Sequence, residues 1–391
     1  MYHFAAYCLR GLETYLTEEL EFHGLKTIRQ HPGCVIFQVP DLKWISFLNQ
    51  QIRIAEHLDL LFFWGETIPE LPQIEEQLLA IDYSPWFDPQ LSFAVRAVRQ
   101  GQHSFQSMDL MRTAARALTL SMNRCGHEIK ANLKQPQLYF RATIYDNYLT
   151  FGLSTNGLPL SQRYPLDFAH EAPLNRTIAA ALLWDSSFRQ HGQLVDPMCG
   201  GGTILIEAAL WRQGRSLDLG RRKYDYCQHS YLSAEQMSDA TFDYQIPVGK
   251  NFIGGERSPK KVAGTALNLE RLNLKEQVTL VHGNARRLSY LKPRHPLVVT
   301  NPPYGIRVMR PSEVDELYRD FADALLHAEV QEVVAITPKK HSWLDSFAKA
   351  GYHLISIREI LYGDMPAFII KHHIEPRANM DAGVDGLAPP K

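Results

Sequence analysis

The 391-residue sequence lacks the features that mark membrane-spanning and secreted proteins. No apolar run approaches the roughly 20 residues that a membrane-spanning helix needs. The first residues, MYHFAAYCLRGLE, reach a charge too soon for a secretory signal peptide. We therefore expect no membrane partner.

Cysteine is also scarce, because only five are present and no CxxC pair occurs among them. This spacing argues against a disulfide framework and against a zinc site, and it fits a reducing cytoplasm, which is the location we predict. His103, His170 and His282 have no ligand-spaced partner, so we expect them to be surface or structural residues and expect no metal. The oligomeric state leaves no signal in the sequence.

An excess of positive charge is missing as well, since the net charge is −1 and the pI is near 7.0. Nucleic-acid binding must then depend on a local patch. Residues 90–143 carry eight cations against two acids, a local charge of +6. Such runs are most often a solvated helix face, but they also suit a surface that contacts phosphates. The candidate RNA-binding residues are Arg96, Arg99, Arg112, Arg116, Lys130 and Lys134.

What the sequence does contain is two different patterns of secondary structure. Up to about residue 155, short strands alternate irregularly with helices that end at glycine, which is an α+β pattern. A polar, turn-rich linker follows, NGLPLSQRYPLDFAHEAP. After it, the order strand, glycine loop, helix repeats and a final hairpin closes the pattern. This succession predicts an α/β fold with a doubly wound, mostly parallel sheet.

A glycine-rich loop lies in the first of these units, VDPMCGGGT. It differs from the dinucleotide fingerprint G-x-G-x-x-G and lacks the Lys-Ser/Thr of a P-loop. Asp196 precedes it at a strand end, where a carboxylate would repel a pyrophosphate. The loop therefore suits a ligand with a positive charge, such as an amino group or a sulfonium.

The next two strand ends carry further polar residues. Glu256 follows the second strand and can accept hydrogen bonds from both hydroxyls of a ribose. Asn284 follows the third strand and can pair with an adenine edge. A cationic amino-acid end, a ribose and an adenine together describe S-adenosylmethionine, which we predict as the cofactor.

The fourth strand ends in TNPPYG, residues 300–305. The Asn301 side-chain oxygen and the Pro302 carbonyl can accept both N–H groups of an exocyclic amine, which exposes the nitrogen lone pair to a methyl sulfonium. Pro302 and Pro303 hold that carbonyl in one direction, and Tyr304 offers a ring on which a base can stack. These four residues are the candidate catalytic site.

The pair DPMCGGGTILIEAA and TNPPYG resembles the THUMP-containing, S-adenosylmethionine-dependent RNA guanine-N2 methyltransferases, including the catalytic half of the bacterial large-subunit rRNA enzyme. RGLETYLTEEL, STNGLPLSQRYP and APLNRTIAAALL are similar to that family too. The resemblance implies a ferredoxin-like region at 1–60, a THUMP RNA-binding domain at 61–165 and a Rossmann-like class I methyltransferase domain at 166–374. Residues 375–391 lack periodicity, so we expect a flexible tail there.

The family also implies which residues hold the cofactor. By matching position, Asp196, Gly200 and Gly202 hold the methionine end, Glu256 the ribose and Asn284 the adenine. The full candidate set is Asp196, Met198, Gly200, Gly201, Gly202, Thr203, Glu256, Arg257, Asn284 and Ala285. The chain departs from the family at Asn284, where aspartate is usual, and at Asn175, where lysine is typical.

We predict an enzyme that methylates the N2 amine of guanine in structured RNA, with rRNA favoured and tRNA as the second choice. The same turn also serves an adenine N6 amine in DNA or RNA, although the basic N-terminal half favours RNA. A catalytically silent RNA-binding protein of this fold is a further alternative. Asn284 supports that alternative and the intact Asn301–Tyr304 turn opposes it.

Overall fold

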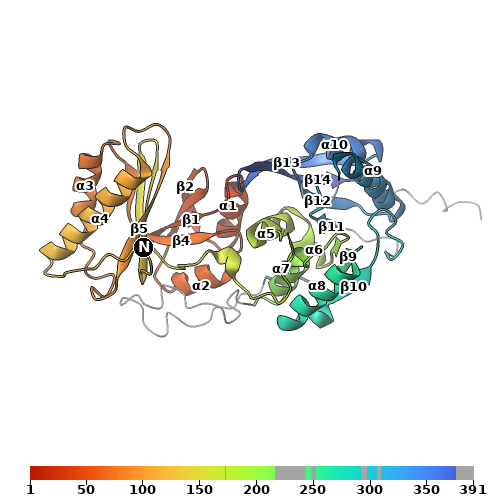
Figure 1. The fold of residues 1–391 in the computed structure, drawn as a ribbon, viewed down its shortest axis with the longest axis horizontal. Coiled ribbons are helices and arrows are strands. Elements are labelled where there is room, and N and C mark those ends of the chain that lie inside the picture. The colour runs from red at the N-terminus through yellow and green to blue at the C-terminus, as the bar shows by residue number, and fades with distance from the viewer. Residues whose placement is uncertain (172, 216–243, 248–251, 292–296, 306–309, 376–391) are drawn as a thin grey trace, which may run out of the picture.

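The computed structural model describes residues 1–171, 173–215, 244–247, 252–291, 297–305 and 310–375. Figure 1 shows an elongated molecule with the N-terminal half at one end and the C-terminal half at the other. Almost all of the tail expected at 375–391 lies outside the described residues, as does Cys227. No helix among the described residues is long and apolar enough to cross a membrane.

The N-terminal half is built on one seven-stranded sheet of order β2-β3-β1-β4-β7-β6-β5. Only β5 and β6 are parallel neighbours. The strands are β1 (Tyr2–Tyr7), β2 (Lys26–His31), β3 (Cys34–Val39), β4 (His57–Glu66), β5 (Phe93–Gln100), β6 (Leu138–Tyr145) and β7 (Tyr148–Ser154). The domain boundary expected between residues 60 and 61 falls inside β4, so the two regions expected on either side of it share this sheet.

Four helices cover one face of this sheet. They are α1 (Glu13–Phe22), α2 (Trp44–Gln51), α3 (Leu71–Leu79) and α4 (Ser107–Arg124). Leu60 lies in the core beneath α1 and α2, and Leu153 lies in the core beneath α3 and α4. Because these two leucines pair directly across β4 and β7, both helix pairs lie on the same face.

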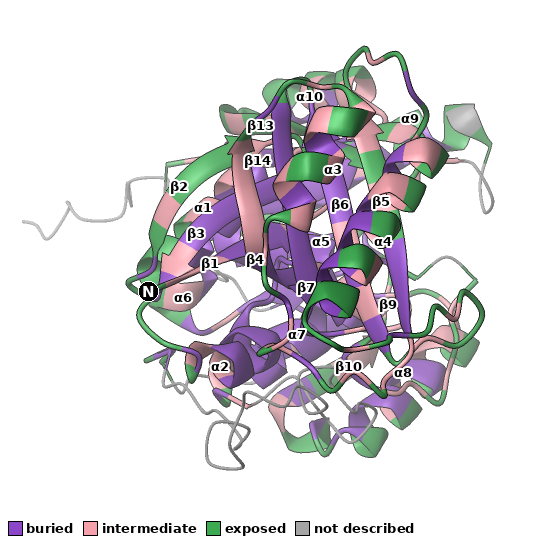
Figure 2. Ribbon diagram, turned by 90° about the vertical axis from the view of Figure 1, so that its left-hand side faces the viewer, coloured by how far each residue is buried: buried purple, intermediate pink, exposed green. Residues whose placement is uncertain are grey.

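The opposite face of the sheet carries a smaller cluster that includes Ile36, Leu61 and Tyr148. In the part of the chain that the structure describes, no helix contributes to this cluster. Figure 2, viewed from the end of the molecule that carries α3 and α4, shows the exposed outer surfaces of these helices.

The C-terminal half is a second seven-stranded sheet, of order β10-β9-β8-β11-β12-β14-β13. Its strands are β8 (Val195–Asp196), β9 (Phe252–Glu256), β10 (Val278–His282), β11 (Leu297–Thr300), β12 (Glu332–Thr337), β13 (His353–Tyr362) and β14 (Met365–His373). The five strands from β8 to β12 are parallel, and β13 and β14 form the antiparallel hairpin that the sequence predicts.

Helices accompany this second sheet. They are α5 (Arg176–Asp185), α6 (Phe188–His191), α7 (Thr203–Arg212), α8 (Pro259–Arg271), α9 (Pro311–His327) and α10 (Lys340–Lys349). The expected Rossmann-like α/β fold is therefore confirmed.

The two halves share one hydrophobic core rather than meeting at a polar interface. Leu16 of α1 and Leu48 of α2 belong to the same buried cluster as Ile178 of α5 and Trp211 of α7. Beside it, Glu207 of α7 forms ion pairs with two fully buried arginines, Arg53 at 3.7 Å and Arg163 at 3.5 Å. The shared core holds the N-terminal half in a defined position relative to the glycine-loop helix.

Candidate active site

The candidate site lies where the parallel strands β8, β9, β10 and β11 end, which is the usual ligand position in such sheets. The glycine loop leaves β8 and returns to begin α7. Gly200 and Gly202 have positive φ, +54° and +82°, conformations that residues with a Cβ rarely adopt. The backbone N–H of Cys199 donates to the Gly255 carbonyl at 3.0 Å, which attaches the loop to the neighbouring strand.

Asp196 is buried at the end of β8. Its Oδ1 accepts hydrogen bonds from the Thr300 hydroxyl at 2.8 Å and from the Met198 N–H at 3.2 Å. Burial raises the pKa of this carboxyl to about 7, against an ordinary value of 3.8, although both hydrogen bonds act in the opposite direction. A cationic ligand at this position would favour the ionised form.

Glu256 connects the second strand end to the glycine loop. Its carboxylate accepts hydrogen bonds from the Gly200 N–H at 3.3 Å and from the Ser258 N–H at 2.8 Å. Asn284 is oriented in a similar way, because its Oδ1 accepts from the Arg286 N–H at 3.0 Å. Both side chains are thus held at the pocket wall by backbone groups before any ligand binds.

The Asn301–Tyr304 turn carries a buried hydrogen-bond acceptor for which the described residues supply no donor. The Oδ1 atom of Asn301 is buried and accepts no hydrogen bond from the described residues. A buried acceptor without a donor is unfavourable by about 1–3 kcal/mol unless a ligand supplies one. The neighbouring Pro302 is buried too, and Pro303 after it restricts the direction of the Pro302 carbonyl.

Tyr318 of α9 braces this turn from behind. Its hydroxyl donates to the Pro303 carbonyl at 3.2 Å and lies 2.9 Å from the Thr337 hydroxyl of β12. Tyr318 is fully buried, and burial raises the pKa of its hydroxyl well above the ordinary value, so it is a permanent donor at neutral pH. No sequence pattern singled out this residue, because it lies on a helix 14 residues after the turn.

One cavity of about 850 Å³ brings these groups together. All four candidate catalytic residues line it. So do nine of the ten candidate cofactor residues, namely Asp196, Met198, Gly200, Gly201, Thr203, Glu256, Arg257, Asn284 and Ala285. Gly202 is the exception: it does not line the cavity, and a Cβ there would lie only 2.6 Å from the Thr265 side chain.

The cavity wall also includes a linker segment that the sequence analysis treated only as a connection. His170 and Leu174 line the cavity, and His170 packs on the glycine loop, within 3.3 Å of where a Cβ on Gly200 would lie. We expected His170 to be a surface or structural residue, and the sequence carried no signal for its packing on the glycine loop.

Two side chains hold that linker segment over the pocket. Asn268 of α8 accepts from the Phe168 N–H and donates to the carbonyls of Phe168 and Gly201. The Tyr362 hydroxyl, at the end of β13, accepts from the Asn175 N–H at 3.1 Å and donates to the Pro173 carbonyl at 3.0 Å. The segment thus joins the glycine loop to the C-terminal hairpin.

The candidate RNA-binding cations belong to the N-terminal half, at the end of the molecule away from β9, β10 and β11 (Figure 1), and they do not form one patch. Arg112 and Arg116 extend from the outer surface of α4, where they pair with Asp109 at 3.9 Å and Glu75 at 3.1 Å. Arg96 is exposed on the opposite face of the sheet, 4.2 Å over the Tyr139 ring. The remaining three are Arg99 near the end of β5 and Lys130 and Lys134 in the loop after α4.

Two known families match this chain. A THUMP domain matches residues 69–154, and a domain described as "RMKL-like, methyltransferase domain" matches residues 163–362. The latter covers the strand ends, the glycine loop and the Asn301–Tyr304 turn.

Whole proteins also match. The chain is 30% identical to a tRNA (guanine(6)-N2)-methyltransferase of Methanocaldococcus jannaschii over 91% of this chain and 95% of that protein. It is 25% identical to the ribosomal RNA large subunit methyltransferase K/L of Buchnera aphidicola, over 79% of this chain but only 45% of that protein. The solved structure of SMU.472 complexed with SAH superimposes with a TM-score of 0.80 at 18% identity, covering 96% of this chain and 98% of that one.

These matches agree with the geometry described above, since the cavity has acidic groups for a cationic cofactor and an unmet acceptor for an amine. The expected methyl donor, S-adenosylmethionine, is confirmed. The chain therefore belongs to the THUMP-containing family of S-adenosylmethionine-dependent RNA methyltransferases with an RMKL-like catalytic domain.

Proposed function

We propose that this enzyme transfers a methyl group from S-adenosylmethionine to the exocyclic N2 amine of a guanine in tRNA. Similarity along nearly the whole length of a tRNA guanine-N2 enzyme favours tRNA over the rRNA that the sequence analysis preferred. It also favours guanine N2 over adenine N6. The scattered cysteines and the RNA substrate further suggest the cytoplasm as the place of action.

The observation that carries this proposal is the buried, unpaired Oδ1 of Asn301 in the same cavity as Asp196. S-adenosylmethionine supplies an electrophilic methyl on a sulfonium, and Asp196 favours that positive ligand. Glu256 is placed for the ribose hydroxyls and Asn284 for the adenine. A cofactor bound in this way would lie next to the Asn301–Tyr304 turn, because all of these residues line one cavity.

The turn prepares the target amine for attack. The lone pair of a guanine amine is delocalised into the ring, so the amine is a poor nucleophile. Asn301 Oδ1 and the Pro302 carbonyl accept its two N–H groups and favour a pyramidal nitrogen, which directs the lone pair toward the methyl group. Tyr304 holds the ring by stacking. The methylated nitrogen loses its proton readily, so no strong base is needed.

The guanine must leave its helix to reach this turn, because the amine is inaccessible within a stacked duplex. The cations of the THUMP region position the RNA by its phosphates and do not read the base. Specificity for one nucleotide then depends on where the RNA docks on the N-terminal half relative to the turn.

Mass spectrometry of nucleosides tests the proposed function. RNA from a strain lacking the gene is incubated with the enzyme and isotope-labelled S-adenosylmethionine, and the tRNA and rRNA fractions are digested separately. We expect labelled N2-methylguanosine in the tRNA fraction. Labelled N6-methyladenosine, or no labelled nucleoside at all, would contradict the proposal.

A further inference from the structure

The N-terminal sheet contains a split between two of its central strands. Strand β1 pairs with β3 from Tyr2 onward, but it pairs with β4 only from Phe4, which lies opposite Leu60. Beyond Leu60, β4 continues to Glu66 along β7, with an irregularity between Leu61 and Phe63. A register irregularity of this kind bends a strand, and β1 and β4 part next to it.

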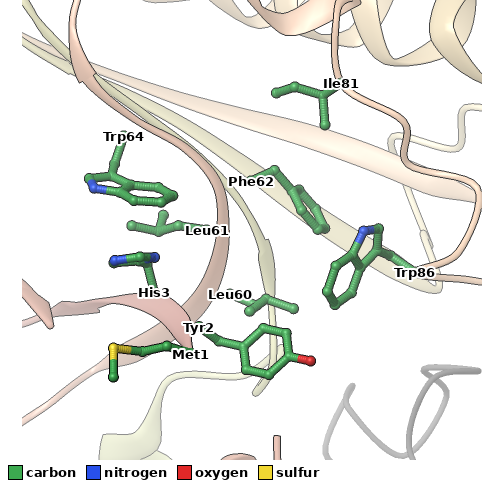
Figure 3. A pocket seen from close by; sticks show the side chains of 9 residues that line it. All are labelled: Met1, Tyr2, His3, Leu60, Leu61, Phe62, Trp64, Ile81 and Trp86. Carbon is green, nitrogen blue, oxygen red and sulfur yellow. The ribbon is translucent and has the colours of Figure 1, made fainter. Parts of the chain in front are cut away.

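A cavity of about 290 Å³ opens at this split. Figure 3 shows aromatic side chains approaching it from both sides of the sheet. On the face without helices, the His3 ring stacks on Trp64 with ring centroids 3.7 Å apart. On the face with helices, Trp86 packs against Phe62 at 5.5 Å and against the edge of Tyr2 at 6.2 Å.

The lining indicates what kind of group this cavity takes. Aromatic and aliphatic side chains form most of it, together with the N-terminal residue Met1, and no aspartate, glutamate, lysine or arginine lines it. Its volume lies at the lower end of the range for ligand pockets, about 300 Å³, so it suits a single ring system rather than a whole nucleotide. Aromatic side chains bind unpaired bases by stacking, largely without regard to sequence.

A cationic residue lies in line with the cavity on the face without helices. Leu61 pairs with Gly152, Gly152 with Arg141 and Arg141 with Arg96, so the row crosses four strands. The spacing of neighbouring strands puts Arg96 about 14 Å from Leu61. Arg141 is engaged by Asp59 at 2.8 Å, whereas Arg96 is exposed.

We propose that the split between β1 and β4 binds one unpaired base of the RNA substrate, while Arg96 contacts a phosphate of the same single strand. This inference rests on the proposed function, because it takes RNA as the substrate. It adds a second contact with the RNA, separate from the catalytic cavity and from the cations of α4. The base in the split is not the one that is methylated.

The test compares two RNA probes, a blunt hairpin and the same hairpin with a four-nucleotide single-stranded overhang that contains 2-aminopurine. For the unaltered enzyme we expect the overhang to tighten binding about tenfold, within the range that one stacked base contributes. We also expect the 2-aminopurine fluorescence to be quenched on binding. Equal affinity for both probes, with unquenched fluorescence, would overturn the proposal. The split would then bind a peptide or another apolar group instead of a base.

Variants of the two tryptophans show whether the tighter binding of the overhang probe depends on the split. Trp64→Ala and Trp86→Ala should each lose most of the tenfold gain, and Trp64→Phe should retain it because a ring remains. Trp44→Ala, a tryptophan of α2 that does not line the cavity, is the matched control and should behave like the unaltered enzyme. An undiminished gain in both alanine variants would refute the site.

The blunt hairpin separates this inference from the proposed function and from misfolding. Trp64→Ala and Trp86→Ala should bind the blunt hairpin as tightly as the unaltered enzyme does, which shows that they are folded. If the unaltered enzyme binds neither probe and methylates no RNA, the proposed function fails. If it methylates RNA but gains nothing from the overhang, only the split is refuted.

Discussion

The two seven-stranded sheets of this protein serve function in different ways. In the parallel sheet, the functional groups gather at one edge, because successive strands all end there and each contributes a short loop. In the N-terminal sheet, strands from distant parts of the chain bring their side chains together on a face and at a split. A short sequence pattern, an apolar strand followed by a loop, identifies each functional residue at a strand end. No such local pattern identifies residues that meet on a sheet face.

The strand-end site should depend on single atoms, so Asn301→Ala is expected to have the largest effect. Loss of one of two acceptors for the target amine should lower kcat by about 10²–10³-fold, the effect of removing one oriented hydrogen-bonding group from an active site. Single-turnover methylation measures this loss, and calorimetry should show unchanged cofactor affinity. Asn123→Ala, on the exposed surface of α4, is the matched control and should retain full activity. Normal turnover in Asn301→Ala would rule out the amine clamp.

Asp196→Asn should weaken S-adenosylmethionine binding by about 10- to 100-fold, because the cofactor loses its charged partner. It should also stabilise the protein without ligand. Burial raises the pKa of this carboxyl to about 7, so its ionised form destabilises the folded protein. The destabilisation is absent below pH 4, grows between pH 4 and 7, and is complete above pH 7.

Thermal unfolding at several pH values checks whether Asp196→Asn stabilises the protein more at high pH than at low pH. The gain in unfolding free energy of Asp196→Asn should be about 2–4 kcal/mol at pH 8 and should vanish near pH 4. In the unaltered enzyme, cofactor affinity should fall as the pH drops below 7, because binding then requires loss of a proton. A gain that is equal at pH 4 and pH 8 would show that the carboxyl is not desolvated.

RNA binding by the α4 surface should depend on its total charge rather than on any single hydrogen bond. Arg112→Glu combined with Arg116→Glu should weaken RNA binding about tenfold at physiological salt and reduce the slope of log affinity against log salt by roughly two. Arg319→Glu with Lys349→Glu, on α9 and α10 at the other end of the molecule (Figure 1), is the charge-matched control. If both pairs change the affinity equally, α4 is not the surface that meets the RNA.

Tyr318→Phe should have the smallest effect on the strand-end site. It removes the hydrogen bond to the Pro303 carbonyl, which contributes about 1 kcal/mol, so kcat should fall about fivefold with unchanged cofactor affinity. Tyr352→Phe is the matched control, because its buried hydroxyl also donates to a backbone carbonyl, that of Val330 at 2.7 Å. A comparable loss of kcat in both variants would show general destabilisation instead of a brace on the turn.

The same contrast between the sheets explains what the sequence could predict. The sequence could predict that Asp196, Glu256, Asn284 and Asn301 lie close together, because each lies at the end of an apolar strand or within two residues of it. The ends of parallel strands meet at one edge of a sheet, and all four residues line one cavity. The Asn301 side-chain oxygen was expected to be one of two acceptors for an amine, and the structure shows this oxygen buried and without a hydrogen bond from the described residues.

Residues that act through packing between distant segments left no such pattern. Tyr318 and Asn268 lie on helices, and their roles depend on the loops that these helices happen to face. The basic stretch was read as one patch, but strand β5 and helix α4 place Arg96 and Arg112 on opposite sides of the sheet. The split beside Trp64 depends on where β1 stops pairing with β4, which no local pattern records.

The most direct test of the central claim is to remove the acceptor amine from the RNA. Once the methylated guanosine is mapped, a tRNA transcript with inosine at that position differs only by lacking the N2 amine. The account predicts full methyl transfer to the guanosine transcript and none to the inosine transcript, while both bind the enzyme with similar affinity. Undiminished methylation of the inosine transcript would contradict an amine held by Asn301 and Pro302.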